Sequence, residues 1–180
     1  MLTGKISMFL NYIKGFFLKR KLKNIFYDVK STRLVSAIKT VGLLVDESYF
    51  LKREALVKEL VSNGIIEENI KIIIYKDKLS KSQKDSGVFF SSKELTWNAE
   101  ITSVAVNDFI KEEFDLLISY YEVQKPILKL ITHRSNAKFK AGFATIDKRL
   151  NHLIISAHTE DYRVFTSELF RYLKKIKQNR

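Results

Sequence analysis

The chain lacks cysteine and contains a single proline and six glycines among its 180 residues. The absence of cysteine excludes disulfide bonds, thiolate metal sites and a cysteine nucleophile, and it suits a reducing cytoplasm. So few prolines and glycines leave little room for linkers. No apolar run approaches the ~20 residues that a membrane-spanning helix needs. We therefore predict a cytoplasmic protein, with peripheral contact at the inner membrane as the alternative.

The sequence also lacks the short motifs of common catalytic and cofactor sites. No glycine-rich nucleotide-binding loop is present, and no serine lies in the Gly-x-Ser-x-Gly context of a hydrolase. The only histidines are His133, His152 and His158, and their spacing matches no helical metal-binding pair. We therefore predict no cofactor, no metal ion and no catalytic residue, and we favour a protein that is not an enzyme.

Positive charge is in excess, and most of it lies at the two ends of the chain. The net charge is +12; residues 1–30 hold seven Lys or Arg against one acid, and residues 163–180 hold six against one. The middle of the chain is nearly neutral. We expect an anionic partner, if one binds, to contact the two terminal segments.

Residues 1–30 are predicted to form a basic amphipathic helix. Because its apolar residues lie on two faces, the helix either has a kink near residues 15–21 or contacts a different partner with each half. Its first apolar face includes Phe9 and Ile13, and a nearly opposite second face includes Leu22 and Phe26. Either both halves pack on the rest of the domain, or the first half anchors to a membrane surface or a partner protein. The basic run that would contact an anion consists of Lys19, Arg20, Lys21 and Lys23.

Residues 31–180 alternate between buried strands and amphipathic helices. Continuous apolar runs predict strands that are buried on both faces, and apolar residues at helical spacing predict the crossovers. The predicted strands are 38–45, 70–75, 87–90, 116–120, 138–143 and 153–155, and the predicted helices are 49–63, 103–113, 126–134 and 162–177. This order predicts an α/β fold: a single Rossmann-like, mostly parallel sheet of about six strands with helices on both faces.

A ligand crevice is expected beyond the carboxyl ends of the strands, between the first strand and the 116–120 strand, where strand order should reverse. The side chains that would line it are Asp46, Glu47, Ser119, Tyr121 and Glu122. The three carboxylates would repel a phosphate. They permit a magnesium site or an acid/base pair, but acids after a strand more commonly cap the next helix.

A basic band follows the only proline. Lys125, Lys129 and His133 recur every four residues, which places them on one helix face. The candidate anion-binding residues of this band are Lys129, His133, Arg134, Lys138 and Lys140. They form either a solvated face or a contact surface for RNA or acidic lipid. Trp97 is expected to cover an edge of the core.

Three stretches resemble an uncharacterised family of Bacteroidota proteins, seen mainly in flavobacteria. They are Phe-Asp-Leu-Leu-Ile-Ser-Tyr-Tyr at 114–121, Ala-Lys-Phe-Lys-Ala-Gly-Phe at 137–143 and Asp-Lys-Arg-Leu-Asn at 147–151. A weaker likeness is to the N-terminal half of heptosyltransferase-like GT-B glycosyltransferases, in which an Asp-Leu-Leu-Ile strand precedes a helix and a basic residue before Gly-Phe. That likeness implies a Rossmann-like fold and, as an activity, glycosyl transfer.

Two hypotheses about function follow. The first is a non-catalytic α/β domain that binds an anionic or amphipathic partner through its basic terminal helices; the partner is RNA or the ribosome, an acidic membrane surface, or a protein. The alternative is a glycosyltransferase-like enzyme or enzyme subunit. A homo-oligomer is compatible with either hypothesis.

Overall fold

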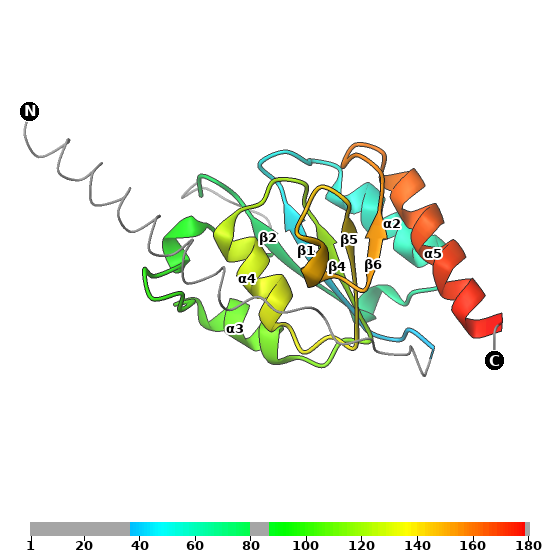
Figure 1. Cartoon of the computed structure of the whole chain (residues 1–180), viewed down its shortest axis with the longest axis horizontal. Coiled ribbons are helices and arrows are strands. Elements are labelled where there is room, and N and C mark those ends of the chain that lie inside the picture. The colour runs from blue at the N-terminus through cyan, green and yellow to red at the C-terminus, as the bar shows by residue number, and fades with distance from the viewer. Residues whose placement is uncertain (1–36, 80–86, 179–180) are drawn as a thin grey trace, which may run out of the picture.

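The computed structural model describes residues 37–79 and 87–178, which form a three-layer α/β domain (Figure 1). Every strand and helix predicted within these residues is present. The strands are β1 (Val41–Asp46), β2 (Ile70–Tyr75), β3 (Val88–Phe90), β4 (Leu116–Tyr120), β5 (Phe139–Phe143) and β6 (Leu153–Ile155). The helices are α2 (Arg53–Ser62), α3 (Val104–Lys111), α4 (Pro126–Arg134) and α5 (Tyr162–Gln178), with short 3₁₀ turns η1 (Glu67–Asn69), η2 (Ser92–Glu94) and η3 (Lys148–Leu150). The predicted helix of residues 1–30 lies outside the described part of the chain.

All six strands run parallel in the order β3-β2-β1-β4-β5-β6. The chain therefore builds outward from β1 in one direction, returns to the centre, and builds outward from β4 in the other. The predicted reversal of strand order between the first strand and the 116–120 strand is confirmed. Such a reversal separates the loops at the carboxyl ends of the two central strands and leaves a crevice between them.

Helices cover both faces of the sheet (Figure 1). On one face α3 and α4 bury Phe109 and Leu128 against β1, β2 and β4, and on the other α2 and α5 bury Leu60 and Phe165 against β1, β4 and β5. Neighbouring residues of β1 point to opposite sides, so Leu44 contributes to the first core and its neighbours to the second. This two-sided burial explains why the central strands are continuously apolar.

Gly42 allows a close approach between β1 and the residues that precede β4. A Cβ atom at this position would lie 2.7 Å from Cδ2 of Phe114 and 3.0 Å from Cζ of Phe109. These two rings contact each other at a centroid distance of 4.8 Å. A larger side chain at Gly42 would displace this aromatic pair from the central strand.

The first strand begins at Val41, three residues later than the predicted start at Ile38. The backbone N–H groups of Lys39 and Thr40 donate to Oδ2 of Asp115, at 2.9 and 3.1 Å, instead of joining a strand. The Asp115 backbone N–H in turn donates to Oγ1 of Thr40 at 3.0 Å. Asp115 thus anchors the chain where it enters the sheet.

The first helix of the described chain begins at Arg53, four residues later than predicted. Asp46 holds the preceding segment in a turn, because its Oδ1 accepts from the Ser48 N–H at 3.0 Å and its carbonyl accepts from the N–H of Phe50. Phe50 is fully buried and packs on the ring of Tyr120 at 4.8 Å. The buried ring fixes the turn, and the helix begins only after it.

Trp97 does not cover the core as predicted; 65% of it is exposed. It lies in a tight turn in which the Thr96 N–H donates to the Glu100 carbonyl at 2.9 Å. Ala99 in the same turn has a positive φ of 65° and is buried in place of the tryptophan. The turn therefore directs the smaller side chain inward.

Candidate functional site

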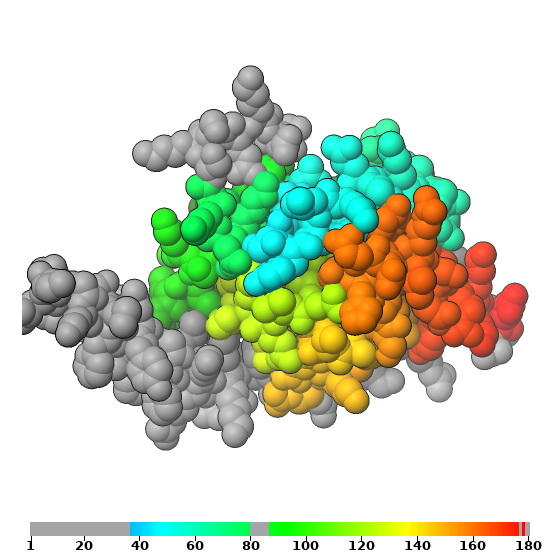
Figure 2. Space-filling model, turned by 90° about the horizontal axis from the view of Figure 1, so that it is seen from above, coloured from blue at the N-terminus to red at the C-terminus, as the bar shows by residue number. Residues whose placement is uncertain are grey.

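The crevice between β1 and β4 lies at the carboxyl edge of the sheet, and the chain itself closes it. Seen onto this edge, the segment after β1 packs directly against the segment after β4 (Figure 2). Asp46 ends β1 and is only 3% exposed, while Tyr121 follows β4 and is fully buried. The candidate residues at this edge are therefore mostly inside the protein.

Lys125, the residue before α4, fills the crevice with its side chain. Its Nζ lies 2.8 Å from Oδ2 of Asp46 and 2.9 Å from Oδ1 of Asp77, and its side chain is 13% exposed. The same ammonium group lies 4.8 Å from the ring centre of Tyr49 and 4.3 Å from that of Tyr75. Two carboxylates and two aromatic faces therefore surround the ammonium group of Lys125, where an external cation could otherwise bind.

The charged side chains in the crevice pair with one another. Asp46 Oδ2 is buried and accepts no hydrogen bond of good geometry, so its contact with Lys125 is a charge pairing. The hydrogen bond from Lys125 lowers the pKa of Asp77 below its usual value. Burial raises the pKa of Tyr75, which donates to Oδ1 of Asp77 at 2.9 Å. Two carboxylates face the single ammonium group, so the crevice has no excess of positive charge to attract a phosphate.

Glu47 and Glu122 have partners other than Lys125. Glu47 pairs with Arg53 at 2.7 Å and with Lys76 at 3.1 Å. Glu122 accepts from the Thr159 N–H at 2.8 Å, which ties the end of β4 to the segment before α5. Within residues 37–79 and 87–178, no three acidic or histidine side chains gather in a cluster that could hold a metal ion.

Asp46 and Glu47 were expected to cap the helix that follows the first strand, but the structure shows different contacts. Lys52 precedes α2 and makes no side-chain capping bond, while Asp46 closes the turn ahead of the helix. Neither Asp46 nor Glu47 therefore caps α2 directly. Asp46 holds the loop between β1 and α2, and Glu47 pairs with Arg53 at the start of α2.

Ser119 and Tyr121 belong to a buried hydroxyl cluster under α4. Their hydroxyl groups lie 3.1 Å and 2.9 Å from Oγ1 of Thr132, and all three residues are fully buried. Burial raises the pKa of Tyr121. These hydroxyl groups hold α4 to β4 and are not accessible to a ligand at the surface.

Much of the predicted basic band is directed into the protein. One turn after Lys125, the Nζ of Lys129 lies 3.5 Å from Oδ2 of Asp147 and 3.2 Å from Oε1 of Gln124. Arg134, at the end of α4, is exposed, and His133 is half-buried. Burial first, and then the charge of Lys140, lowers the pKa of His133.

Lys140 has an internal role that its sequence position does not reveal. It is 6% exposed, and its Nζ donates to the carbonyls of Thr132 and His133 at 2.8 and 3.1 Å. These carbonyls lie at the C-terminal end of α4, where a cation is favourable. Burial lowers the pKa of Lys140 to about 8. Lys140 therefore binds the helix end rather than lying on the surface.

Lys138 is exposed and pairs with Asp115. Its Nζ lies 2.9 Å from Oδ1 of Asp115, the anchor of the strand entry. Burial alone would raise the pKa of Asp115, but the hydrogen bonds from Lys138 and from the Lys39 and Thr40 backbone lower it. At the amino ends of the strands, too, a lysine of the basic band pairs with a carboxylate of the same chain.

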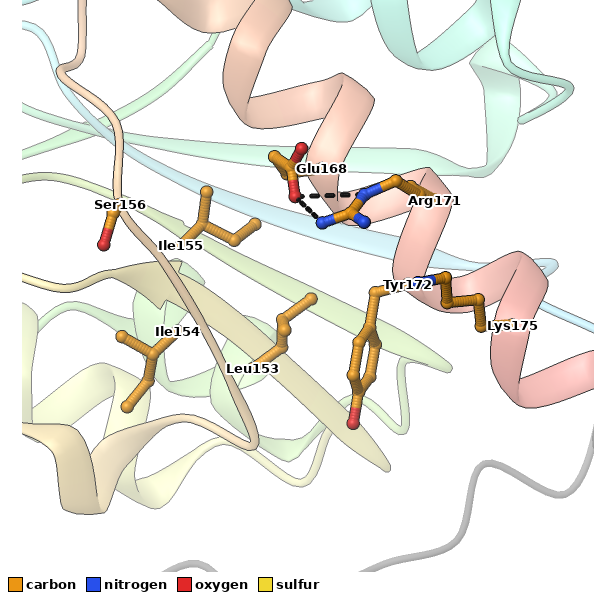
Figure 3. A pocket seen from close by; sticks show the side chains of 8 residues that line it. All are labelled: Leu153, Ile154, Ile155, Ser156, Glu168, Arg171, Tyr172 and Lys175. Atoms are coloured by element: carbon orange, nitrogen blue, oxygen red, sulfur yellow. Dashed lines mark hydrogen bonds and ion pairs between the residues drawn. The ribbon is translucent and has the colours of Figure 1, made fainter.

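A groove of about 350 Å³ lies between β6 and α5 (Figure 3). Leu153, Ile154, Ile155 and Ser156 form its strand side, and Glu168, Arg171, Tyr172 and Lys175 form its helix side. Arg171 is hydrogen-bonded to Glu168, and Tyr172 descends from α5 beside Leu153 (Figure 3). The groove therefore joins an apolar strand to basic and aromatic side chains of the helix.

A comparison with family models matches residues 14–176 to a family of unknown function, DUF6913. The chain belongs to DUF6913. No curated protein and no solved structure matches it. In the part of this DUF6913 chain that the structure describes, no helix is both long and apolar enough to cross a membrane.

Sequence reasoning missed the three residues that distinguish these sites. The four-residue spacing groups Lys125 with its helix face, although its position next to the carboxyl ends of β1 and β2 decides its contacts. Arg171 and Lys175 were counted only within the net charge of the last segment. Their separation of four residues does signal a shared helix face. The run Lys19, Arg20, Lys21 and Lys23 lies outside the described residues.

Proposed function

We propose that this DUF6913 protein is a non-catalytic α/β binding domain that holds an anionic partner through its basic terminal segments. One observation carries the proposal: the cations of α5 lie at the surface, whereas three lysines around α4, Lys125, Lys129 and Lys140, contact groups of the same chain. Arg163, Arg171, Lys174 and Lys175 are exposed along α5. The only acid within α5 is Glu168, so the helix surface keeps an excess of positive charge.

The closed crevice supports a binding role over a catalytic one. A ligand is expected beside the reversal of strand order between β1 and β4, and there Lys125 contacts Asp46 and Asp77. A substrate at this position would have to displace a lysine from two carboxylates. The outer face of α5 requires no such rearrangement.

The proposal is tested by salt-dependent binding of the full chain. The probes are an unstructured single-stranded RNA and vesicles with and without acidic lipid. We expect retention at about 50 mM salt that weakens steeply as salt is added, because binding releases counterions. If none of these anionic probes, nor an acidic peptide, is retained at low salt, the proposal is wrong.

A charge-matched pair of variants locates the contact. Changing Arg171, Lys174 and Lys175 together to Gln removes three charges from α5. Changing the exposed Lys58, Lys93 and Lys111 to Gln removes three charges elsewhere. We expect only the first variant to lose binding. A third variant, in which Lys19, Arg20, Lys21 and Lys23 are changed to Gln, measures how much the N-terminal segment contributes to binding.

The alternative, a glycosyltransferase-like enzyme, is favoured by the strand order and the parallel sheet alone. It requires that a sugar nucleotide enter the crevice beside Asp46. A thermal-shift series with nucleotides and sugar nucleotides tests this alternative. An increase in melting temperature with one of them, abolished in Asp46→Asn, would support the enzyme and count against the binding domain.

A further inference from the structure

The groove beside β6 lies at an edge of the sheet. Within the described residues β6 pairs only with β5. The His152 N–H, just before the strand, donates inward to the Lys140 carbonyl at 2.8 Å. The Ile155 carbonyl accepts from the Ala144 N–H at 2.9 Å and therefore faces β5. Because backbone directions alternate along a strand, the N–H and carbonyl of Ile154 face outward. The outward backbone groups of an edge strand are a template for another strand.

Helix α5 extends over this edge. Glu168, Arg171, Tyr172 and Lys175 follow one another at helical spacing, and all four line the groove. They flank the buried stripe of α5, which includes Leu169 and Leu173. The helix therefore packs on the sheet with one stripe and overhangs the position next to β6 with the adjacent stripe (Figure 3).

Building on the proposed function, we propose that the anionic partner is an acidic, extended peptide segment of another protein, which adds as a strand to the outer edge of β6. Its backbone pairs with the outer edge of the strand. Its apolar side chains contact Leu153 and Tyr172, and its carboxylates contact Arg171 and Lys175. Strand addition of this kind takes affinity from main-chain hydrogen bonds and specificity from the neighbouring side chains.

The composition of the groove favours a peptide over other occupants. RNA would use the cations and Tyr172, but it would leave the outward backbone groups and Leu153 without a matching partner. A second copy of this chain would bring the same basic helix face against the first and be repelled. An acidic strand complements the backbone, the apolar side chains and the charge together.

The probe is a fluorescein-labelled peptide of twelve residues in which Glu alternates with Val and Thr, titrated with the full chain. Its control has the same sequence but carries N-methyl groups on the central backbone amides. The control keeps the charge and removes the donors of a strand. We expect the control to bind at least about ten-fold more weakly, because several main-chain hydrogen bonds are lost.

Matched variants test the contact with the helix. Changing Arg171 and Lys175 together to Gln should weaken peptide binding about ten-fold, because two exposed charge contacts with the peptide are lost. Lys174→Gln removes one charge from the same helix but outside the groove lining, and we expect less than about two-fold weakening.

The outcomes separate this inference from the proposed function. If the N-methylated peptide binds as well as its parent and Lys174→Gln weakens binding as much as Lys175→Gln does, strand addition is wrong and electrostatic binding stands. If no peptide, RNA or acidic vesicle binds at low salt, both fail. A dimer in solution that dissociates when Arg171 and Lys175 are changed to Gln would assign the groove to a second copy and overturn the inference.

Discussion

Helices α4 and α5 are both basic, but they use their cations in opposite ways. Around α4, Lys125, Lys129 and Lys140 turn toward carboxylates or carbonyls of the same chain. Along α5, Arg171 and Lys175 line an open groove. The lysines around α4 are paired inside the protein, whereas the cations of α5 lie at the surface and outnumber Glu168, with which Arg171 pairs.

The largest effect is expected at Lys125. Lys125→Met would leave the buried carboxylate of Asp46 without a counter-charge, and we expect the free energy of unfolding to fall by about 3 kcal/mol. Urea unfolding measures the change. Adding Asp46→Asn should restore most of the loss, and Lys129→Met, one helical turn later, should cost less. An unchanged urea midpoint for Lys125→Met would show that α4 does not need its inward cation.

Lys140 should make stability increase at alkaline pH. The folded chain releases this proton near its lowered pKa of about 8, whereas an unfolded lysine holds its proton to about pH 10.4. The unfolded state thus binds more protons between these values, and the free energy of unfolding should rise by about 1–2 kcal/mol from pH 8 to pH 10.

The Lys140→Met variant provides the reference for this measurement. Other lysines and tyrosines titrate in both proteins, so the difference between their urea-unfolding curves isolates Lys140. A difference that stays constant from pH 8 to pH 10 would contradict the buried, internally bound lysine.

Asp147 should contribute stability that is lost in acid. The hydrogen bond from Arg149 lowers its pKa to about 2, so this contribution is complete above the unfolded value near 4 and disappears as pH falls through 2. We expect Asp147→Asn to cost about 1 kcal/mol at pH 7, a value reduced because Arg149 is partly exposed. Unfolding curves of both proteins should converge near pH 2; a gap that persists there would point to a packing effect.

The smallest effect on stability is expected on α5. Lys175→Gln should change the free energy of unfolding by less than about 0.5 kcal/mol, because the side chain is exposed. Thermal unfolding measures it. A loss as large as that of Lys125→Met would mean that α5, like α4, uses its cations to hold the fold.

The sequence predicted the ends of the strands and helices to within four residues, because their apolar patterns depend only on local chemistry. The departures have tertiary causes. Hydrogen bonds to Asp115 keep Lys39 and Thr40 out of the first strand. The burial of Phe50 holds a turn before α2, so the helix begins later than predicted. The turn around Ala99, which leaves Trp97 exposed, carries no comparable sequence signal.

The reversal of strand order was predicted correctly, but the contacts of the side chains beside it were not. Strand order can be inferred from the alternation of elements, and it places Asp46 at the reversal point. Asp46 contacts Lys125, a residue 79 positions later in the chain. No local sequence pattern predicts a contact between residues so far apart.

By itself, then, the sequence determined the α/β class, the succession of elements and the excess of positive charge in the last helix. Only the tertiary structure decided which cations remain at the surface. The reason is physical: a lysine pairs with whichever carboxylate or carbonyl lies within about 3 Å, as Lys125 and Lys140 do. Folding brings such partners to α4, and it leaves Arg171 and Lys175 of α5 beside an open sheet edge.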